Sequence, residues 1–186
     1  MTTPIFLGGI FSQSLRFMVL TVVVAGYDTS KNQLSMTMKL LLERPDMYER
    51  CAEDLLFCRK VTEESLRHSA IATPYREAAQ DFSYQGFHFL KGETLVLAPP
   101  LGNRDPSVFV EPQTFNPERE NAGRNVAFGR GVHFCPGQWL ARNQLQEGLH
   151  LIARRLRNPR VKGTVEWRPF LGAWGLKSLP ITFDPA

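Results

Sequence analysis

Cysteine is scarce in this chain, and its few cysteines are not spaced like the ligands of a structural zinc site. The 186 residues hold three, Cys51, Cys58 and Cys135. An odd number at these separations argues against a disulfide framework, and no Cys/His cluster has zinc spacing. We therefore expect a reducing, cytoplasmic compartment. We also expect Cys51 and Cys58, seven residues apart, to share one helix face as small apolar residues.

Long apolar runs and strong net charge are missing as well. The stretch Phe17 to Gly26 has about half the length that a bilayer-spanning helix requires, and residues 1–11 lack the basic segment of a secretory signal. The net charge of +4 is mild, and no nucleic-acid motif accompanies it. We expect no membrane span and no nucleic-acid partner. A basic group is interpreted as a solvated helix end: Arg154, Arg155, Arg157, Arg160 and Lys162.

Apolar periodicity predicts a mainly helical chain with small sheets. A long helix is expected from Ser12 to Glu43, although Thr21–Val24 taken alone would suggest a strand. Pro45 ends it, and Asp46 with Glu49 predicts a second helix that begins with a capping box. Further helices are expected through residues 64–67 and from Gln138 to about Asn158. Strands are expected at residues 82–84, 87–89, 94–98, 165–167 and 179–183, with a proline-rich meander over residues 99–124.

The most informative segment is Phe128-Gly-Arg-Gly-Val-His-Phe-Cys135-Pro-Gly137, which precedes a helical run. Glycines allow a tight loop, and Pro136 suits the first position of a helix. The free N–H groups of Gly137 and Gln138 can then point at the sulfur, because a helix N-terminus favours a thiolate. Such a thiolate suits a nucleophile, a metal ligand or a haem ligand, and a buried structural cysteine is the plain alternative. A nucleophile paired with His133 is disfavoured, because the two residues are only two apart.

The spacing Phe-x-x-Gly-x-His-x-Cys-x-Gly, followed by Leu140-Ala141-Arg142, resembles the haem-binding loop of bacterial cytochromes P450, the haem-thiolate monooxygenases. The resemblance implies that Cys135 is the axial iron ligand. It also implies haem b as cofactor and dioxygen as co-substrate. Phe128 would pack beside the sulfur and limit water there. Other residues implied at the cofactor are Gly129 and Gly137.

Ala25-Gly26-Tyr27-Asp28-Thr29-Ser30 resembles the distal oxygen-binding segment of the same family. A glycine inside a helix costs about 1 kcal/mol relative to alanine, and Ala25 and Gly26 would let a flat macrocycle approach. The resemblance implies that Asp28 and Thr29 deliver protons as an acid–alcohol pair. A threonine that bonds back to its own helical turn is the alternative.

Further matches imply structural and cofactor contacts. Glu64 and Arg67 share a helix face, and with Arg119 of Phe115-Asn-Pro-Glu-Arg119 they resemble the family's buried triad; an exposed pair would mean little. His133 and Arg76 resemble cations that meet the haem propionates, with a loop histidine and a solvated strand end as the alternatives. Two segments would face the substrate: Ala70, Ile71, Ala72 and Thr73, and Leu171 to Trp174.

The resemblance implies the C-terminal half of the cytochrome P450 fold, an α+β region with a long distal helix, Glu-x-x-Arg helix, meander, cysteine loop and proximal helix. We interpret residues 1–186 as one haem-binding region. It would insert one oxygen atom into an apolar organic molecule, using electrons from a ferredoxin or flavodoxin-like donor. The alternative is a truncated, non-catalytic haem-binding or interaction protein, whose uncovered helix would self-associate or bind a complementing N-terminal half. The basic residues near the loop would steer the donor: Arg124, Arg130 and Arg142.

Overall fold

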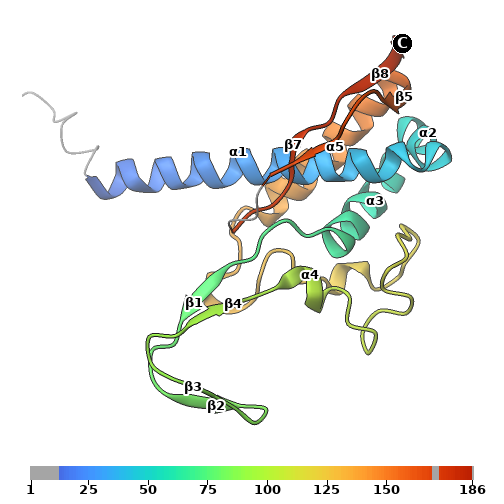
Figure 1. Ribbon diagram of the computed structural model, residues 1–186. Helices are drawn as coiled ribbons and strands as arrows, with labels where there is room; N and C mark the ends of the chain where they lie inside the picture. Colours follow the sequence, from blue (N-terminus) through green and yellow to red (C-terminus); the bar gives the residue numbers. More distant parts are fainter. Residues whose placement is uncertain (1–12, 169–171, 186) are drawn as a thin grey trace, which may run out of the picture.

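A long helix crosses the molecule, and the helices over residues 45–53, 55–68 and 138–155 contact it (Figure 1). The computed structural model describes residues 13–168 and 172–185, so Ser12 and Leu171 lie outside the described residues. Helix α1 (Gln13–Leu42) has 30 residues and is therefore about 45 Å long. The predicted helix is confirmed, and its β-branched stretch at Thr21–Val24 is helical.

Two shorter helices follow and turn the chain back. Helix α2 (Pro45–Glu53) begins with Pro45 in its first turn, and Arg44 is its cap residue without a side-chain cap. The predicted capping box at Asp46 was therefore wrong, because Pro45 already starts the helix and places Asp46 inside it. Helix α3 (Leu55–His68) is capped by Asp54, whose carboxylate accepts the N–H of Phe57 at 2.9 Å.

This break corrects the expectation for the two buried cysteines. Cys51 lies on α2 and Cys58 on α3, so they do not share a helix face. Asp54 ends one helix and caps the next between them. The Cys58 thiol donates to the Cys51 carbonyl oxygen at 3.2 Å. The two residues thus tie the two helices together.

The strands pair as two-stranded antiparallel sheets in the described residues. Strands β1 (Tyr75–Glu77) and β4 (Thr94–Val96) lead to the hairpin of β2 (Phe82–Tyr84) and β3 (Phe87–Phe89), an arm that extends away from the helices (Figure 1). The rings of Phe82 and Phe89, opposite in register, stack at 4.8 Å. The remaining pairs are β5 (Leu156–Val161) with β8 (Ile181–Pro185), and β6 (Glu166–Trp167) with β7 (Leu176–Ser178).

Helix α5 (Gln138–Arg155) runs directly into strand β5. The predicted end near Asn158 was thus late, and Arg157, Arg160 and Lys162 do not belong to a helix end. Asn158 takes a positive φ of 47°, and the register of β5 shifts between Arg157 and Arg160. The Asn-Pro pair that suggested a helix stop therefore forms an irregularity inside a strand.

The main core lies where α1, α2, α3 and α5 meet. It includes side chains without solvent exposure, namely Leu41, Cys51, Cys58, Val61 and Leu149. A smaller cluster joins Met36 to Ile71 and Leu176. In the sequence, the meander lies between β4 and the cysteine loop, and it contains α4 (Pro99–Gly102) and the 3₁₀ turn η1 (Ala122–Arg124). This packing fixes the C-terminal half of α1 against the helix that begins just after Cys135.

Candidate functional site

The loop before Cys135 is held by its own backbone. Gly129 and Gly131 both take a φ of +74°, a region that glycine enters without strain. The N–H of Cys135 donates to the Phe128 carbonyl at 3.0 Å. The N–H of Phe134 donates to Gly131 at the same distance, closing the short turn η2 (Gly131–His133). The loop presents Cys135 half-buried and with a free thiol.

The start of α5 differs in one detail from the sequence expectation. The N–H of Gln138 donates to the carbonyl oxygen of Cys135 at 3.4 Å, so this amide serves the backbone of the loop. Gly137, the cap residue of α5, lies close to the sulfur, because a side-chain carbon at this position would stand 3.9 Å from Sγ. The thiol therefore sits directly at the helix N-terminus.

A hollow of about 470 Å³ lies between α1 and the first turns of α5. Gly26 borders it, and apart from its chain neighbours and the nearby helix backbone no atom stands within 4 Å of the place where a side-chain carbon would be. Ser30 on α1 donates to Gln144 on α5 at 3.3 Å and bridges the two helices. Leu140, five residues after Cys135, also borders the hollow. Its lining residues are Val22, Val23, Gly26, Tyr27, Ser30, Lys31, Leu34, Leu140, Gln144 and Leu145.

Asp28 is bound by two cations and one side-chain amide. Arg168 contacts both carboxylate oxygens at 3.1 Å, and Lys31 and Asn32 each contact one at 3.1 Å. The hydrogen bond from Arg168, followed by that from Lys31, lowers the pKa of Asp28 to about 2. Sequence reasoning missed Arg168, which lies 140 residues away and has no local signal. Asp28 is therefore an anchored anion.

Thr29 bonds back to its own helical turn, the alternative to a proton-delivery role. Its hydroxyl donates to the carbonyl oxygen of Ala25, one turn earlier in α1. The hydroxyl proton is thus engaged within the helix, while the threonine oxygen can still accept a hydrogen bond. Ala25 and Gly26 lie on the exposed part of α1.

The structure brings Glu64, Arg67 and Arg119 together. Glu64 and Arg67 have no solvent exposure, and two guanidinium nitrogens donate to the two carboxylate oxygens at 2.8 and 2.7 Å. Arg119 approaches Glu64 at 3.3 Å and is 8% exposed at its side chain. Arg67 also donates to the carbonyls of Asn103 and Pro112. The charges are thus satisfied by a network that ties α3 to the meander.

The two expected propionate cations are both exposed. His133 lies on η2 in the cysteine loop. Arg76 lies on β1, and its guanidinium donates to the carbonyl of its neighbour Tyr75 at 2.8 Å. Phe128, at the start of the cysteine loop, lies under the guanidinium of Arg142, which is 4.6 Å from the centre of its ring. The first two side chains are therefore solvated, whereas Phe128 is packed.

The two expected substrate-facing segments pair with each other. Ala72 and Ala173 form an isolated antiparallel bridge, and the indole N–H of Trp174 donates to the Ala70 carbonyl at 2.9 Å. Ala70, Ile71 and Thr73 are at most 6% exposed. Trp174 stacks on Trp167 at 5.4 Å. These side chains are therefore occupied by contacts within the chain.

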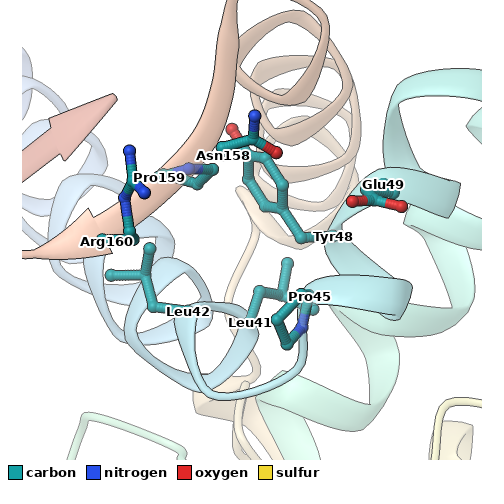
Figure 2. A pocket seen from close by; sticks show the side chains of 8 residues that line it. All are labelled: Leu41, Leu42, Pro45, Tyr48, Glu49, Asn158, Pro159 and Arg160. Atoms are coloured by element: carbon teal, nitrogen blue, oxygen red, sulfur yellow. The ribbon is translucent and has the colours of Figure 1, made fainter. Parts of the chain in front are cut away.

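A second hollow lies at the other end of α5 and is unrelated to the cysteine (Figure 2). It has about 260 Å³ and lies where α1, α2 and β5 meet. Burial raises the pKa of Tyr48, on its wall, to about 12. Helix α5, with 18 residues and a length of about 27 Å, separates the cysteine loop from β5, which contributes to this hollow. Its lining residues are Leu41, Leu42, Pro45, Tyr48, Glu49, Asn158, Pro159 and Arg160.

Residues 10–179 match the family model described as Cytochrome P450. The chain belongs to the cytochrome P450 family. It is 36% identical over 174 residues to luteothin monooxygenase of Streptomyces thioluteus, covering 92% of this chain and 43% of that protein. A putative cytochrome P450 140 of Mycobacterium bovis is 35% identical over 173 residues, which are 92% of this chain and 40% of that relative.

Solved structures give the same result for the fold. The cytochrome P450 PksS of Bacillus subtilis 168 superimposes with a TM-score of 0.86 at 28% identity, over 94% of this chain and 46% of that one. P450BioI, solved in complex with a hexadec-9Z-enoic acid ligated acyl carrier protein, gives 0.80 at 30% identity, over 89% and 43%. The chain thus spans less than half of these relatives, and it adopts the expected part of the P450 fold.

The family implies haem as cofactor, and the residues present fit that group. Cys135 offers a half-buried sulfur donor on a fixed loop, and a cysteine sulfur is the axial ligand of this enzyme class. The neighbouring hollow is mostly apolar, and Gly26 keeps space open on its α1 side.

Among the described residues, no helix combines the length and the hydropathy needed to cross a membrane.

Proposed function

We propose that this chain is the haem-thiolate part of a monooxygenase that acts on an apolar organic molecule. The observation that carries the proposal is the fixed cysteine loop at the start of α5, next to an apolar hollow shared with α1. Haem b bound there would supply an iron centre for monooxygenation, in which dioxygen, two electrons from a donor protein and two protons give one oxygen atom inserted in the substrate and one water. Cys135 would hold the iron as thiolate.

The chain's own residues support this in distinct ways. Gly129 and Gly131 set the backbone angles that bring the thiol to the N-terminus of α5. Phe128, packed under Arg142, limits water beside the sulfur. Gly26 leaves room on α1 for a flat ligand. His133 and Arg76 are both exposed and would pair with carboxylates of the cofactor, Arg76 through guanidinium N–H groups other than the one bound to Tyr75.

Asp28 and Thr29 would move protons toward the reacting oxygen. The low pKa of Asp28 means that its carboxylate is ionised at neutral pH. An ionised carboxylate can relay protons by accepting and releasing them briefly, but it cannot store one. The Thr29 oxygen can accept a hydrogen bond while its own proton stays on the Ala25 carbonyl. Relay through this pair therefore requires Asp28 to leave Arg168 transiently.

The substrate class and the electron donor are proposed from the family. The hollow beside α1 is mostly apolar, and P450BioI is named as a complex with a fatty acid linked to an acyl carrier protein. An apolar organic substrate fits both. A ferredoxin or flavodoxin-like donor would approach the exposed Arg124 and Arg130 near the loop. Glu64, Arg67 and Arg119 would act structurally, by holding the meander that leads to Cys135.

The decisive experiment is the spectrum of the reduced, carbon monoxide-bound chain after haem reconstitution. We expect the red-shifted Soret band of a thiolate ligand, lost in Cys135→Ala and kept in Cys51→Ala. The second variant is the matched control, because it removes a different thiol by the same change; circular dichroism reports whether either variant unfolds. A band of the neutral-thiol or histidine type in the unmutated chain would contradict the proposal.

A specific observation favours a second candidate function, that of a non-catalytic haem-binding or interaction protein. The first half of α1 is apolar and exposed, with Phe17 and Val22 both at 71%. Such a surface predicts self-association or a complementing partner. We therefore expect the isolated chain to bind haem weakly and to turn over poorly. Tight stoichiometric haem and efficient coupled turnover by the monomer would contradict this expectation.

A further inference from the structure

Arg142 does not present its charge to solvent as a docking residue would. Its Nε donates to Glu63 Oε1 at 2.5 Å, and its Nη2 donates to Oε2 of the same carboxylate at 3.4 Å. Its Nη1 donates to Gln138 at 2.6 Å. The side chains of Arg142 and Glu63 are each 19% exposed. The expectation that Arg142 steers an electron donor is therefore corrected, because Glu63 balances its charge and every guanidinium nitrogen has an acceptor.

The same pair touches both ends of the cysteine loop. At the start of the loop, Asn125 donates from its amide to Glu63 at 3.3 Å and accepts the N–H of Ala127 at 3.1 Å. In the middle, the ring of Phe128 lies under the guanidinium of Arg142, whose distance to the ring centre is 4.6 Å. After the cysteine, Gln138 is the first residue of α5 and binds Arg142.

Glu63 and Glu64 are neighbours on α3 and serve different partners. Glu64 pairs with Arg67 and Arg119 and thereby holds the meander. Glu63 pairs with Arg142 and thereby holds the loop and α5. Helix α3 is packed into the core through Val61 and Cys58, so it provides a rigid support for both. A planar guanidinium is suited to bind a carboxylate at two points and to lie on a ring at the same time.

We propose that Glu63 and Arg142 form a clamp that fixes the cysteine loop, so that Arg142 is a positioning residue for the Cys135 thiol. The clamp itself is independent of any cofactor. Its consequence for haem ligation rests on the proposed function.

The test uses the haem-free chain and the rate at which iodoacetamide alkylates Cys135. Mass spectrometry of the three cysteine peptides separates the sites, and Cys51 and Cys58 report global unfolding because both are fully buried. We expect Arg142→Met and Glu63→Gln to raise the Cys135 rate about 5-fold to 30-fold, the factor that one or two lost interactions impose on a local equilibrium. Rates across a pH series separate access from thiolate fraction.

Matched variants serve as controls for the Cys135 alkylation rate. Arg154→Met removes one exposed arginine from the last turn of the same helix, and it should leave the Cys135 rate within about twofold of the unmutated chain. Arg142→Lys should give an intermediate rate, because lysine keeps the charge but loses the planar fork. An unchanged Cys135 rate in Arg142→Met and Glu63→Gln, with Cys51 and Cys58 silent, would overturn the clamp.

Global unfolding of a variant would give a different alkylation pattern, in which Cys51 and Cys58 react as well. If Arg142→Met exposes Cys51 and Cys58, the milder Glu63→Gln and Arg142→Lys variants decide. Reaction of all three cysteines in these variants as well would replace the local clamp with a general role in folding.

A second readout follows haem loading. The clamp predicts a smaller share of the thiolate-type Soret band in Arg142→Met than in the unmutated chain, with partial rescue by Arg142→Lys. Absence of that band from every variant and from the unmutated chain would contradict the proposed function. The alkylation rates of the haem-free chain would still test the clamp.

Discussion

The two halves of helix α1 differ in a way that reverses the usual relation between polarity and burial. In Gln13–Lys31 the side chains are mostly apolar, yet Phe17, Val22 and Val24 are 71%, 71% and 66% exposed. In the half from Asn32 to Leu42 the buried set includes polar residues, namely Asn32, Gln33 and Thr37. Both halves belong to one continuous helix, so the difference comes from what covers each of them.

The covered half shows how polar residues are accommodated in a core. Gln33 donates to the Ser65 hydroxyl at 2.9 Å, and Thr37 lies 2.6 Å from the same oxygen. These bonds offset the cost of removing polar groups from water. The exposed half has no comparable cover among the described residues, although its composition is that of a core. Exposed apolar surface of this kind is typical of interaction sites.

The largest expected effect would break the covered region at its charged centre. Arg67→Ala removes one member of the buried network and leaves Glu64, which has no solvent exposure, with Arg119 as its charged partner. We expect the free energy of unfolding to fall by about 3–5 kcal/mol, measured by urea denaturation. Lys177→Ala, which breaks an exposed pair with Glu166, is the control and should change it by less than about 0.5 kcal/mol. Equal losses in the two variants would contradict a special role for burial.

The next effect compares the two halves of α1 with the same type of change. Leu41 has no solvent exposure, and Leu41→Ala should cost about 2–5 kcal/mol through lost contacts and a cavity. Val23 is 60% exposed, and Val23→Ala should stay within about 0.5 kcal/mol in the monomer. Urea midpoints of both variants at low protein concentration measure this. A cost above 1 kcal/mol for Val23→Ala would mean that the first half of α1 is already covered.

Local signals in the sequence were sufficient for much of this fold. The long helix, the Glu64–Arg67 helix and the glycine loop before Cys135 each follow from a short pattern: periodicity, i,i+3 spacing, or positive-φ glycines. The separate helices of Cys51 and Cys58 could also have been found, because Asp54 is a recognisable N-cap residue.

Long-range pairing was beyond the sequence. Arg168 lies 140 residues from Asp28, and Arg142 lies 79 residues from Glu63. The chain offers 22 basic and 18 acidic side chains, and no pattern says which of them meet. For the same reason, the mutual burial of the Ala70–Thr73 and Trp174 segments could not be seen from their apolar character. Only the packing of the helices decides such pairs.

A smaller effect concerns association through the exposed half of α1. Val22 and Val23 are 71% and 60% exposed on the hollow beside α5. If the apolar half mediates self-association, each Val→Ser change should weaken it about tenfold, because burying a valine contributes about 1.5 kcal/mol and 1.4 kcal/mol is a factor of ten. Sedimentation velocity over a concentration series measures this. Val161→Ser, on strand β5, is the control, and an equal loss there would point to association through another surface.

The smallest effect tests the boundary between the two halves, where Asp28 holds Arg168. The pKa of Asp28 is lowered from 3.8 to about 2, chiefly by Arg168. The folded chain therefore binds this proton less readily than the unfolded one. The resulting stability is fully present above about pH 4 and is lost as the pH falls through about 2.

We expect Asp28→Asn to show a weaker loss of stability than the unmutated chain between pH 4 and pH 2, and to be somewhat less stable at neutral pH. Guanidinium midpoints at pH 2, 4 and 7 measure both. Asp184→Asn also removes a carboxylate that contacts an arginine, but this pair is more than half exposed, so it should leave the difference intact. If Asp28→Asn follows the unmutated chain at every pH, the Arg168 contact does not stabilise the fold, and the point at which α1 becomes covered is set by apolar packing from Asn32 onward.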